Sequence, residues 1–122
     1  MATTTVVDGQ GSKAALDGSK TRVDLIAPQF IEGIGEVLQY GAQKYAEHNW
    51  KKGIKFSAIY GGILRHLFAW FCGEAYDEES GNSHLLHAAC GLMFLFWYTE
   101  SNYQLDYGDC DDRVFCDDRV FC

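Results

Sequence analysis

The sequence predicts an all-α fold, a helical bundle of three to four main helices. Between Val23 and Tyr107, apolar residues recur at the three- and four-residue spacing of helix faces, and short polar segments separate the helical stretches. No segment makes a convincing strand. About 48% of the 122 residues are hydrophobic. Helices this apolar are difficult for a small monomer to bury, so we expect oligomerisation to complete the bundle.

Three parts of the chain differ in composition. Residues 1–17 are polar and predict a flexible N-terminal segment. Residues 18–105 carry the helical patterns and predict one domain. Residues 106–122 form an acidic tail with six Asp and two Arg, in which the hexapeptide DDRVFC occurs twice in tandem. Two copies are too few for a repeat fold, and we assign them no chemistry.

The first main helix is expected over residues 28–47. Pro28 fits its first turn, where the missing N–H costs nothing. An apolar stripe follows at helical spacing and consists of Phe30, Ile31, Ile34, Val37, Leu38, Ala42 and Tyr45. Glu32 and Glu36 lie four residues apart on the other side, where like charges repel mildly. This pair either binds a cation or belongs to a solvated face.

The second main helix is expected over residues 57–72, with Ser57 as its N-cap and Gly73 ending it. Its apolar face consists of Ile59, Tyr60, Ile63, Leu64, Leu67, Trp70 and Phe71. Arg65 lies among small residues on the opposite face. A guanidinium in that setting pairs with a carboxylate in a structural salt bridge or binds a phosphate. His66 falls at the edge of the apolar face.

The third main helix is expected from His84 to about Thr99 and is apolar nearly all round, apart from two histidines. His84 and His87 lie three residues apart and therefore project from the same side. The acidic turn before them carries Asp77 and Glu79, whose charges either stabilise the helix start or belong to a site. The histidines are satisfied core residues or ligands of one ion or phosphate, and the neighbouring carboxylates favour the second interpretation.

Charge and composition exclude several classes of function. The formal net charge of −7 argues against a nucleic-acid polymer as partner, because binding a polyanion requires a basic patch. Five cysteines without a CxxC pair argue against a disulfide scaffold or a zinc ribbon. There is no signal segment and no apolar run long enough to span a bilayer, so we expect a cytoplasmic protein with no membrane partner. The chain also lacks Walker A, GxGxxG and GxSxG motifs.

Several motifs in a fixed order resemble a known family. They are Gly18-Ser19-Lys20-Thr21-Arg22-Val23-Asp24-Leu25, Tyr40-Gly41-Ala42-Gln43-Lys44-Tyr45 with Asn49-Trp50, Arg65-His66-Leu67-Phe68-Ala69-Trp70, Gly73-Glu74, Asp77, Glu79-Ser80-Gly81, His84 and His87-Ala88. Together they cover about residues 18–98. Their order is similar to that of the phage dATP/dGTP diphosphohydrolase family, which is related to the MazG-like all-α nucleoside triphosphate pyrophosphohydrolases.

The resemblance implies a MazG-like bundle that assembles as a homo-oligomer, a dimer or a tetramer. It also implies a magnesium-dependent reaction in which water attacks the α-phosphorus of a purine deoxynucleoside triphosphate, dGTP or dATP, and releases the monophosphate and pyrophosphate. This would be phage nucleotide metabolism in the host cytoplasm. The chain departs from the superfamily at His84-x-x-His87, where a Glu-x-x-Asp is expected. Histidine suits Mn²⁺, Co²⁺ or Zn²⁺ better than Mg²⁺.

The expected site draws on all three helices. The catalytic candidates are Glu36, Glu79 and His84, and the candidate metal ligands are Glu32, Glu36, Asp77, His84 and His87. The candidates for binding the purine deoxynucleotide are Lys20, Arg22, Lys44, Trp50 and Arg65. Two other functions remain open. One is a sequestering protein that binds a nucleotide or nucleotide signal without cleaving it, and the other is a helical subunit that binds only another protein.

Overall fold

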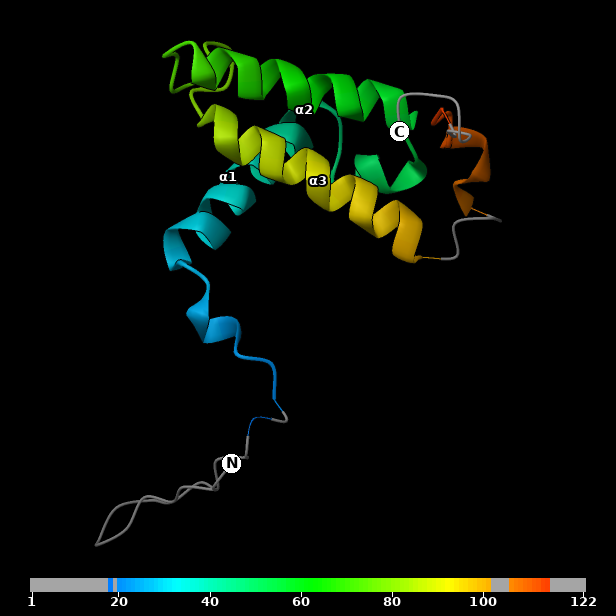
Figure 1. Ribbon diagram of the computed structural model, residues 1–122, viewed down its shortest axis with the longest axis horizontal. Helices are drawn as coiled ribbons and strands as arrows, with labels where there is room; N and C mark the ends of the chain where they lie inside the picture. The colour runs from blue at the N-terminus through cyan, green and yellow to red at the C-terminus, as the bar shows by residue number, and fades with distance from the viewer. Residues whose placement is uncertain (1–17, 19, 102–105, 115–122) are drawn as a thin grey trace, which may run out of the picture.

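The computed structural model of the chain describes residues 18, 20–101 and 106–114, and these residues are helical (Figure 1). The elements are η1 (Val23–Leu25), α1 (Pro28–Lys44), η2 (Asn49–Lys52), α2 (Phe56–Phe71), α3 (His84–Glu100) and η3 (Gly108–Cys110). The described residues form no strand, and only an isolated antiparallel bridge joins Tyr76 to Ser83. The predicted all-α fold with three main helices is therefore confirmed. Residues 1–17 and the second hexapeptide copy lie outside the described residues.

Helices α2 and α3 lie side by side and are joined by the turn after α2, while α1 packs against α3 (Figure 1). Small residues allow this close packing. Gly91 of α3 faces Ile63 of α2, and Gly33 of α1 faces Leu86 of α3. Because these glycines carry no side chain, the neighbouring aliphatic groups occupy the space where a Cβ would stand. The register of α2 against α3 is therefore set by residues on the predicted apolar faces.

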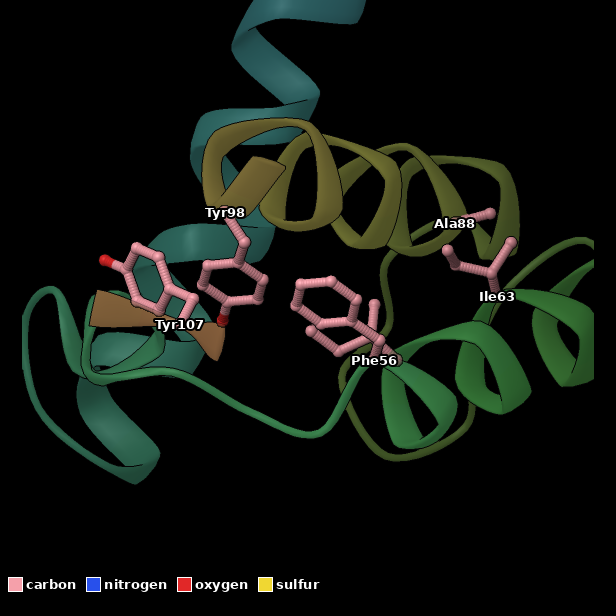
Figure 2. Close-up of a cluster of buried hydrophobic side chains, with 6 residues drawn as sticks. Phe56, Ile63, Ala88, Tyr98 and Tyr107 are labelled. Carbon is pink, nitrogen blue, oxygen red and sulfur yellow. The ribbon is translucent and has the colours of Figure 1, made fainter. Parts of the chain in front are cut away.

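The buried core lies between the first half of α2 and the helix α3, which contributes Ala88 and Tyr98, and Tyr107 completes it (Figure 2). Its rings are close: Phe56 stacks on Tyr98 with centroids 5.7 Å apart, and Tyr107 lies 4.7 Å from Tyr98. The Tyr98 hydroxyl donates a hydrogen bond to the Trp50 carbonyl at 2.5 Å, and the Tyr107 hydroxyl donates to the Lys51 carbonyl at 2.7 Å. Tyr107, which falls in the predicted acidic tail, thus packs in the core. The domain boundary at 105 stays a prediction.

Two helix ends differ from the sequence-based expectation. Helix α1 ends at Lys44, three residues before the predicted end, and the chain then turns through His48, which has a positive φ of 60°. Helix α2 begins at Phe56, whose ring belongs to the core, so Ser57 is not its N-cap. Instead, the N–H and hydroxyl of Ser57 donate to the two carboxylate oxygens of Asp112 at 2.9 and 2.5 Å. A carboxylate distant in sequence thus satisfies a donor of the first turn.

Many large apolar side chains remain on the surface of the single chain. The most exposed ones on the three main helices are Ile31, Tyr60, Phe68, Phe71, Leu92 and Phe96. The stripe predicted for α1 buries little besides Val37, while Phe30 and Ile31 of that stripe are exposed. Within the described part of the chain, none of the helices combines the length and the apolar character that crossing a bilayer requires.

Candidate active site

The acidic turn before α3 is ordered by its own hydrogen bonds. The Asp77 carboxylate accepts from the Ser80 N–H at 3.0 Å, and the Asp77 carbonyl accepts from the Gly81 N–H at 2.8 Å. Ser83 then caps α3, because its hydroxyl oxygen accepts from the Leu85 N–H. The turn therefore holds Asp77 in a fixed position beside the first turn of α3.

Three histidines meet where α2 approaches this turn. His66 of α2 stacks on His87 of α3 with ring centroids 4.5 Å apart and planes 7° from parallel. The Nδ1 atoms of His66 and His84 are 2.8 Å apart. The Nε2 atom of His84 lies 2.9 Å from the Glu74 carboxylate, and that of His87 lies 2.7 Å from the Ser80 hydroxyl. Each ring is thus fixed by at least one polar partner.

One carboxylate joins the histidines and makes the group suitable for a metal ion. Ligand atoms of His66, Asp77 and His84 all lie within 4.8 Å of one another. The Asp77 carboxylate is also 3.9 Å from Nε2 of His87. His84 is buried, while His66 and Asp77 are half-buried. The arrangement can therefore hold a divalent cation through one ligand each from α2, the turn and α3.

Burial and neighbouring charges set the protonation of this group. Burial lowers the pKa of His66, and the neighbouring His87 and His84 lower it further. Burial also lowers the pKa of His87, against the opposing effect of Asp77. For Asp77, burial acts to raise the pKa, but hydrogen bonds from Ser80 and the nearby histidines outweigh it and the net direction is down. His66 and His87 are therefore neutral and Asp77 ionised near pH 7, which is the state that binds metal ions.

Glu79 connects α1 to the same turn. The Tyr40 hydroxyl and the Lys44 ammonium both donate to one Glu79 oxygen, at 2.6 and 2.7 Å. The hydrogen bonds from Lys44 and then Tyr40 lower the pKa of Glu79, and in return the pKa of Lys44 is raised to about 12. Both side chains of the ion pair are partly exposed. An ionised carboxylate and an ammonium thus lie side by side at the edge of the site.

A cavity of about 1090 Å³ connects this polar cluster to an aromatic wall. Its size matches the upper end of the usual range for ligand cavities, about 300–1000 Å³. The polar lining at this cluster includes Lys44, His66, Asp77, Glu79 and His87, and further polar side chains line the cavity elsewhere, among them Glu47, His48, Asn49 and Lys51. Trp50, Phe94 and Trp97 line the aromatic part, with Trp50 stacked on Phe94 at 4.7 Å. The cavity therefore offers charged groups for phosphates and flat rings for a base.

The structure brings together some of the predicted site residues and leaves others apart. Asp77, Glu79, His87, Lys44 and Trp50 line the cavity, and His84 adjoins it through His66. The remaining candidates are exposed and do not line the cavity: Lys20, Arg22, Glu32, Glu36 and Arg65. Of these, Arg22 pairs with Asp24 at 2.7 Å. The roles assigned to these five residues stay predictions.

Sequence reasoning did not select His66, Tyr40 or Glu74 for the site. A signal for His66 was present, because Ile59, Ile63 and His66 follow the spacing of one helix face. That face packs on α3, so a histidine there meets the histidines of α3. Tyr40 and Glu74 gave no such signal, since their partners, Glu79 and His84, are distant in sequence.

Comparisons with known proteins agree with the motifs. A family described as "dATP/dGTP diphosphohydrolase, N-terminal" matches residues 10–107. A protein of Salmonella phage PMBT28 named dATP/dGTP diphosphohydrolase is 40% identical over 81 residues. The match covers 66% of this chain but only 28% of the phage protein, so the chain spans less than a third of that relative. No solved structure matches the chain.

Proposed function

This chain belongs to the family of dATP/dGTP diphosphohydrolase N-terminal domains, and on that premise we propose that it hydrolyses purine deoxynucleoside triphosphates to monophosphate and pyrophosphate. The observation that carries the proposal is the cavity in which His66, Asp77 and His87 lie opposite an aromatic wall. The named phage relative supports the same reaction class and suggests a role in phage nucleotide metabolism.

We propose that the ion is Mn²⁺, Co²⁺ or Zn²⁺ rather than Mg²⁺. The donor set supports this choice, because His66 and His84 offer two imidazoles and Asp77 a single carboxylate. Mg²⁺ prefers oxygen ligands, whereas imidazole suits the later divalent metals. A bound ion supplies Lewis-acid polarisation of a phosphoryl oxygen and a coordinated water of lowered pKa.

The chain's own residues bind the substrate and orient the attacking water. Lys44 neutralises phosphate charge, since it lines the cavity and its ammonium is paired with an exposed carboxylate, that of Glu79. Glu79 is ionised and can accept a hydrogen bond from water at the polar end. Neutral His87 holds a hydrogen bond with Ser80 at the same wall. Trp50 contributes to the wall that contacts the base.

A second candidate function is nucleotide binding without hydrolysis. It is favoured by the short coverage of the phage relative, since chemistry in such longer proteins can reside outside the matched part. It is also favoured by the single carboxylate in the metal-binding group. In this case a purine deoxynucleotide binds in the cavity and is recovered intact, and chelation leaves the affinity unchanged.

The test is to incubate the purified protein with each dNTP and Mg²⁺, Mn²⁺, Co²⁺ or Zn²⁺, with and without chelator, and to separate the products by chromatography. We expect monophosphate and pyrophosphate from dGTP and dATP. Asp77→Asn should lower the rate by about 100-fold or more, the usual scale for losing a key electrostatic group. Glu78→Gln, a change to an exposed acid of the same turn, is the matched control. If the nucleotide is recovered intact under every condition, the hydrolase proposal is contradicted and the binding function is favoured instead.

We also propose that the chain forms a homo-oligomer, as the sequence predicts. The support is the exposed apolar surface of the single chain, in particular Phe68 and Phe71 on α2 and Phe96 on α3. Large apolar side chains exposed in such number are typical of proteins that bury them by association. Light scattering coupled to size exclusion measures the mass directly, and a monomer at micromolar concentration would contradict the proposal.

A further inference from the structure

Both ring nitrogens of His84 are engaged, and one of the two partners decides which nitrogen carries the proton. Nε2 lies 2.9 Å from a Glu74 carboxylate oxygen, and Nδ1 lies 2.8 Å from Nδ1 of His66. A carboxylate only accepts hydrogen bonds. Nε2 of His84 must therefore be the N–H donor, which leaves the lone pair of a neutral ring on Nδ1.

Glu74 is held in place by the end of α2. The Glu74 N–H donates to the Ala69 carbonyl and the Gly73 N–H to the Trp70 carbonyl, both at 3.0 Å. These two bonds form a Schellman motif, with Gly73 at the left-handed position, φ +99°. The carbonyl that follows, that of Ala75, accepts from the N–H of His84 itself at 3.0 Å. The backbone thus fixes Glu74 and His84 relative to each other.

We propose that Glu74 is a positioning residue of the metal centre, fixing the tautomer and orientation of His84 so that its Nδ1 faces the ion shared with His66 and Asp77. The inference rests on the proposed function, because it concerns the ion of that site. Carboxylates that accept from a ligating histidine act in this way in known metal sites.

The spacing of the two rings agrees with this role. Two nitrogens bound to one ion at about 2.0–2.1 Å stand about 2.9–3.4 Å apart, depending on the angle at the ion, and the Nδ1 atoms of His66 and His84, at 2.8 Å, lie close to the lower end of that range. With the lone pair of His84 fixed by Glu74, the neutral His66 ring supplies the single hydrogen between the two Nδ1 atoms. When an ion binds there, this hydrogen moves to Nε2 of His66, so that both Nδ1 lone pairs face the ion. Without Glu74, the His84 ring can take the other tautomer, whose Nδ1–H points at the ion.

The burial of His84 makes the carboxylate decisive. The His84 ring is almost fully buried, whereas the Glu74 side chain is about half exposed. Because little of the His84 ring reaches solvent, the Glu74 carboxylate at 2.9 Å from Nε2 decides which tautomer is favoured. Glu78 is also an exposed acid of the same turn, so a change there matches the change in charge and leaves His84 unaffected.

The first experiment is long-range ¹H–¹⁵N correlation of ¹⁵N-histidine-labelled, metal-free protein, which reports the tautomer of each ring. We expect His84 as the Nε2–H form in the wild type and in Glu78→Ala, and a shift toward the Nδ1–H form in Glu74→Ala. Glu74→Gln keeps one acceptor oxygen and should lie between. An Nδ1–H form in the wild type, or an unchanged tautomer in Glu74→Ala, would overturn the proposal.

The second experiment is titration of the same four proteins with Co²⁺, followed by its visible absorption. Loss of such a partner typically weakens metal binding by about 10- to 100-fold, and we expect that loss for Glu74→Ala and little change for Glu78→Ala. Equal Co²⁺ affinity of the wild type and Glu74→Ala contradicts the role of Glu74 and leaves the metal centre standing. A wild type that takes up no ion contradicts the metal centre and this inference together.

Discussion

Replacing Gly91 by alanine tests whether the close approach of α2 and α3 holds the site together. A Cβ added at Gly91 would lie 2.6 Å from Cγ1 and 3.1 Å from Cδ1 of Ile63, and 3.5 Å from Cγ2 of Ile59. Contacts under 3 Å cannot persist. Because Ile63 is β-branched and buried in a helix, its side chain has little freedom to rotate away. The two helices must therefore separate.

Two opposing terms set the size of the effect. Overpacking a tight core costs about 1–3 kcal/mol, while replacing glycine by alanine inside a helix contributes about 1 kcal/mol of stabilisation. Gly91→Ala should thus lower the free energy of unfolding by about 1 kcal/mol, within about 0–2 kcal/mol. Gly35→Ala on α1 is the matched control, because a Cβ there meets nothing within 4 Å. It should stabilise the protein by up to about 1 kcal/mol.

The assay is urea denaturation followed by tryptophan fluorescence and far-ultraviolet circular dichroism. The free energies of unfolding of the two variants should differ by about 1–3 kcal/mol, with Gly91→Ala below the wild type and Gly35→Ala above it. Co²⁺ titration of the folded Gly91→Ala protein should also show weaker binding, since His66 and His84 of the metal-binding group lie about one and two helical turns from the strained contact. A Gly91→Ala protein as stable as Gly35→Ala would refute the packing argument.

Three further predictions concern the core, the histidines and the start of α2. Tyr98→Phe removes the hydrogen bond from the Tyr98 hydroxyl to the Trp50 carbonyl, which keeps the Gly53 N–H as a donor. The change should cost about 0.5–1.5 kcal/mol in urea denaturation, and a stability equal to that of the wild type would contradict it. Burial lowers the pKa of His66 and His87, so the unfolded chain binds more protons and the free energy of unfolding should fall as the pH drops below about 6.5. Urea denaturation between pH 5 and 8 measures this dependence, and replacing both histidines by glutamine should flatten it. Asp112→Ala removes the carboxylate that is hydrogen-bonded to the first turn of α2 and should lower the free energy of unfolding by about 1 kcal/mol in urea denaturation. An unchanged stability would show that this carboxylate does not cap the helix.

The fold was largely predictable because it follows from local periodicity. The apolar patterns predicted the three helices, and the predicted start of the third helix at His84 is the start of α3 in the structure. The helix ends were less predictable. Ser57 has the chemistry of an N-cap, yet α2 starts one residue earlier because the ring of Phe56 is needed in the core. Tertiary packing overrides capping preference in such cases.

The site was predictable only where its residues are close in sequence. Asp77, Glu79 and His87 lie within one turn and the helix after it, and the structure places all three on the cavity. Contacts between different elements could not be predicted from the sequence. The hydrogen bond from Tyr40 to Glu79 is an example, because the two residues are 39 positions apart in the sequence. Among the described residues, no hydrogen-bond or ion-pair partner faces the like-charged Glu32 and Glu36. Spacing on one helix does not reveal what faces it.

The metal-binding group and the hydrophobic core depend on the same helix register. His66 continues the face of α2 that carries Ile59 and Ile63, and the opposing face of α3 carries His84, Ala88 and Gly91. When the aliphatic part of these faces interlocks, the polar ends meet at the turn where the helices are joined. A shift of one helix by one residue would rotate each side chain by about 100° and separate the rings. The core therefore fixes α2 against α3, and these two helices form two sides of the site, while α1 forms the third. Helix α1 reaches the turn through exposed polar contacts, which are individually weak, so the side of the cavity that it forms is the one able to adjust to a ligand.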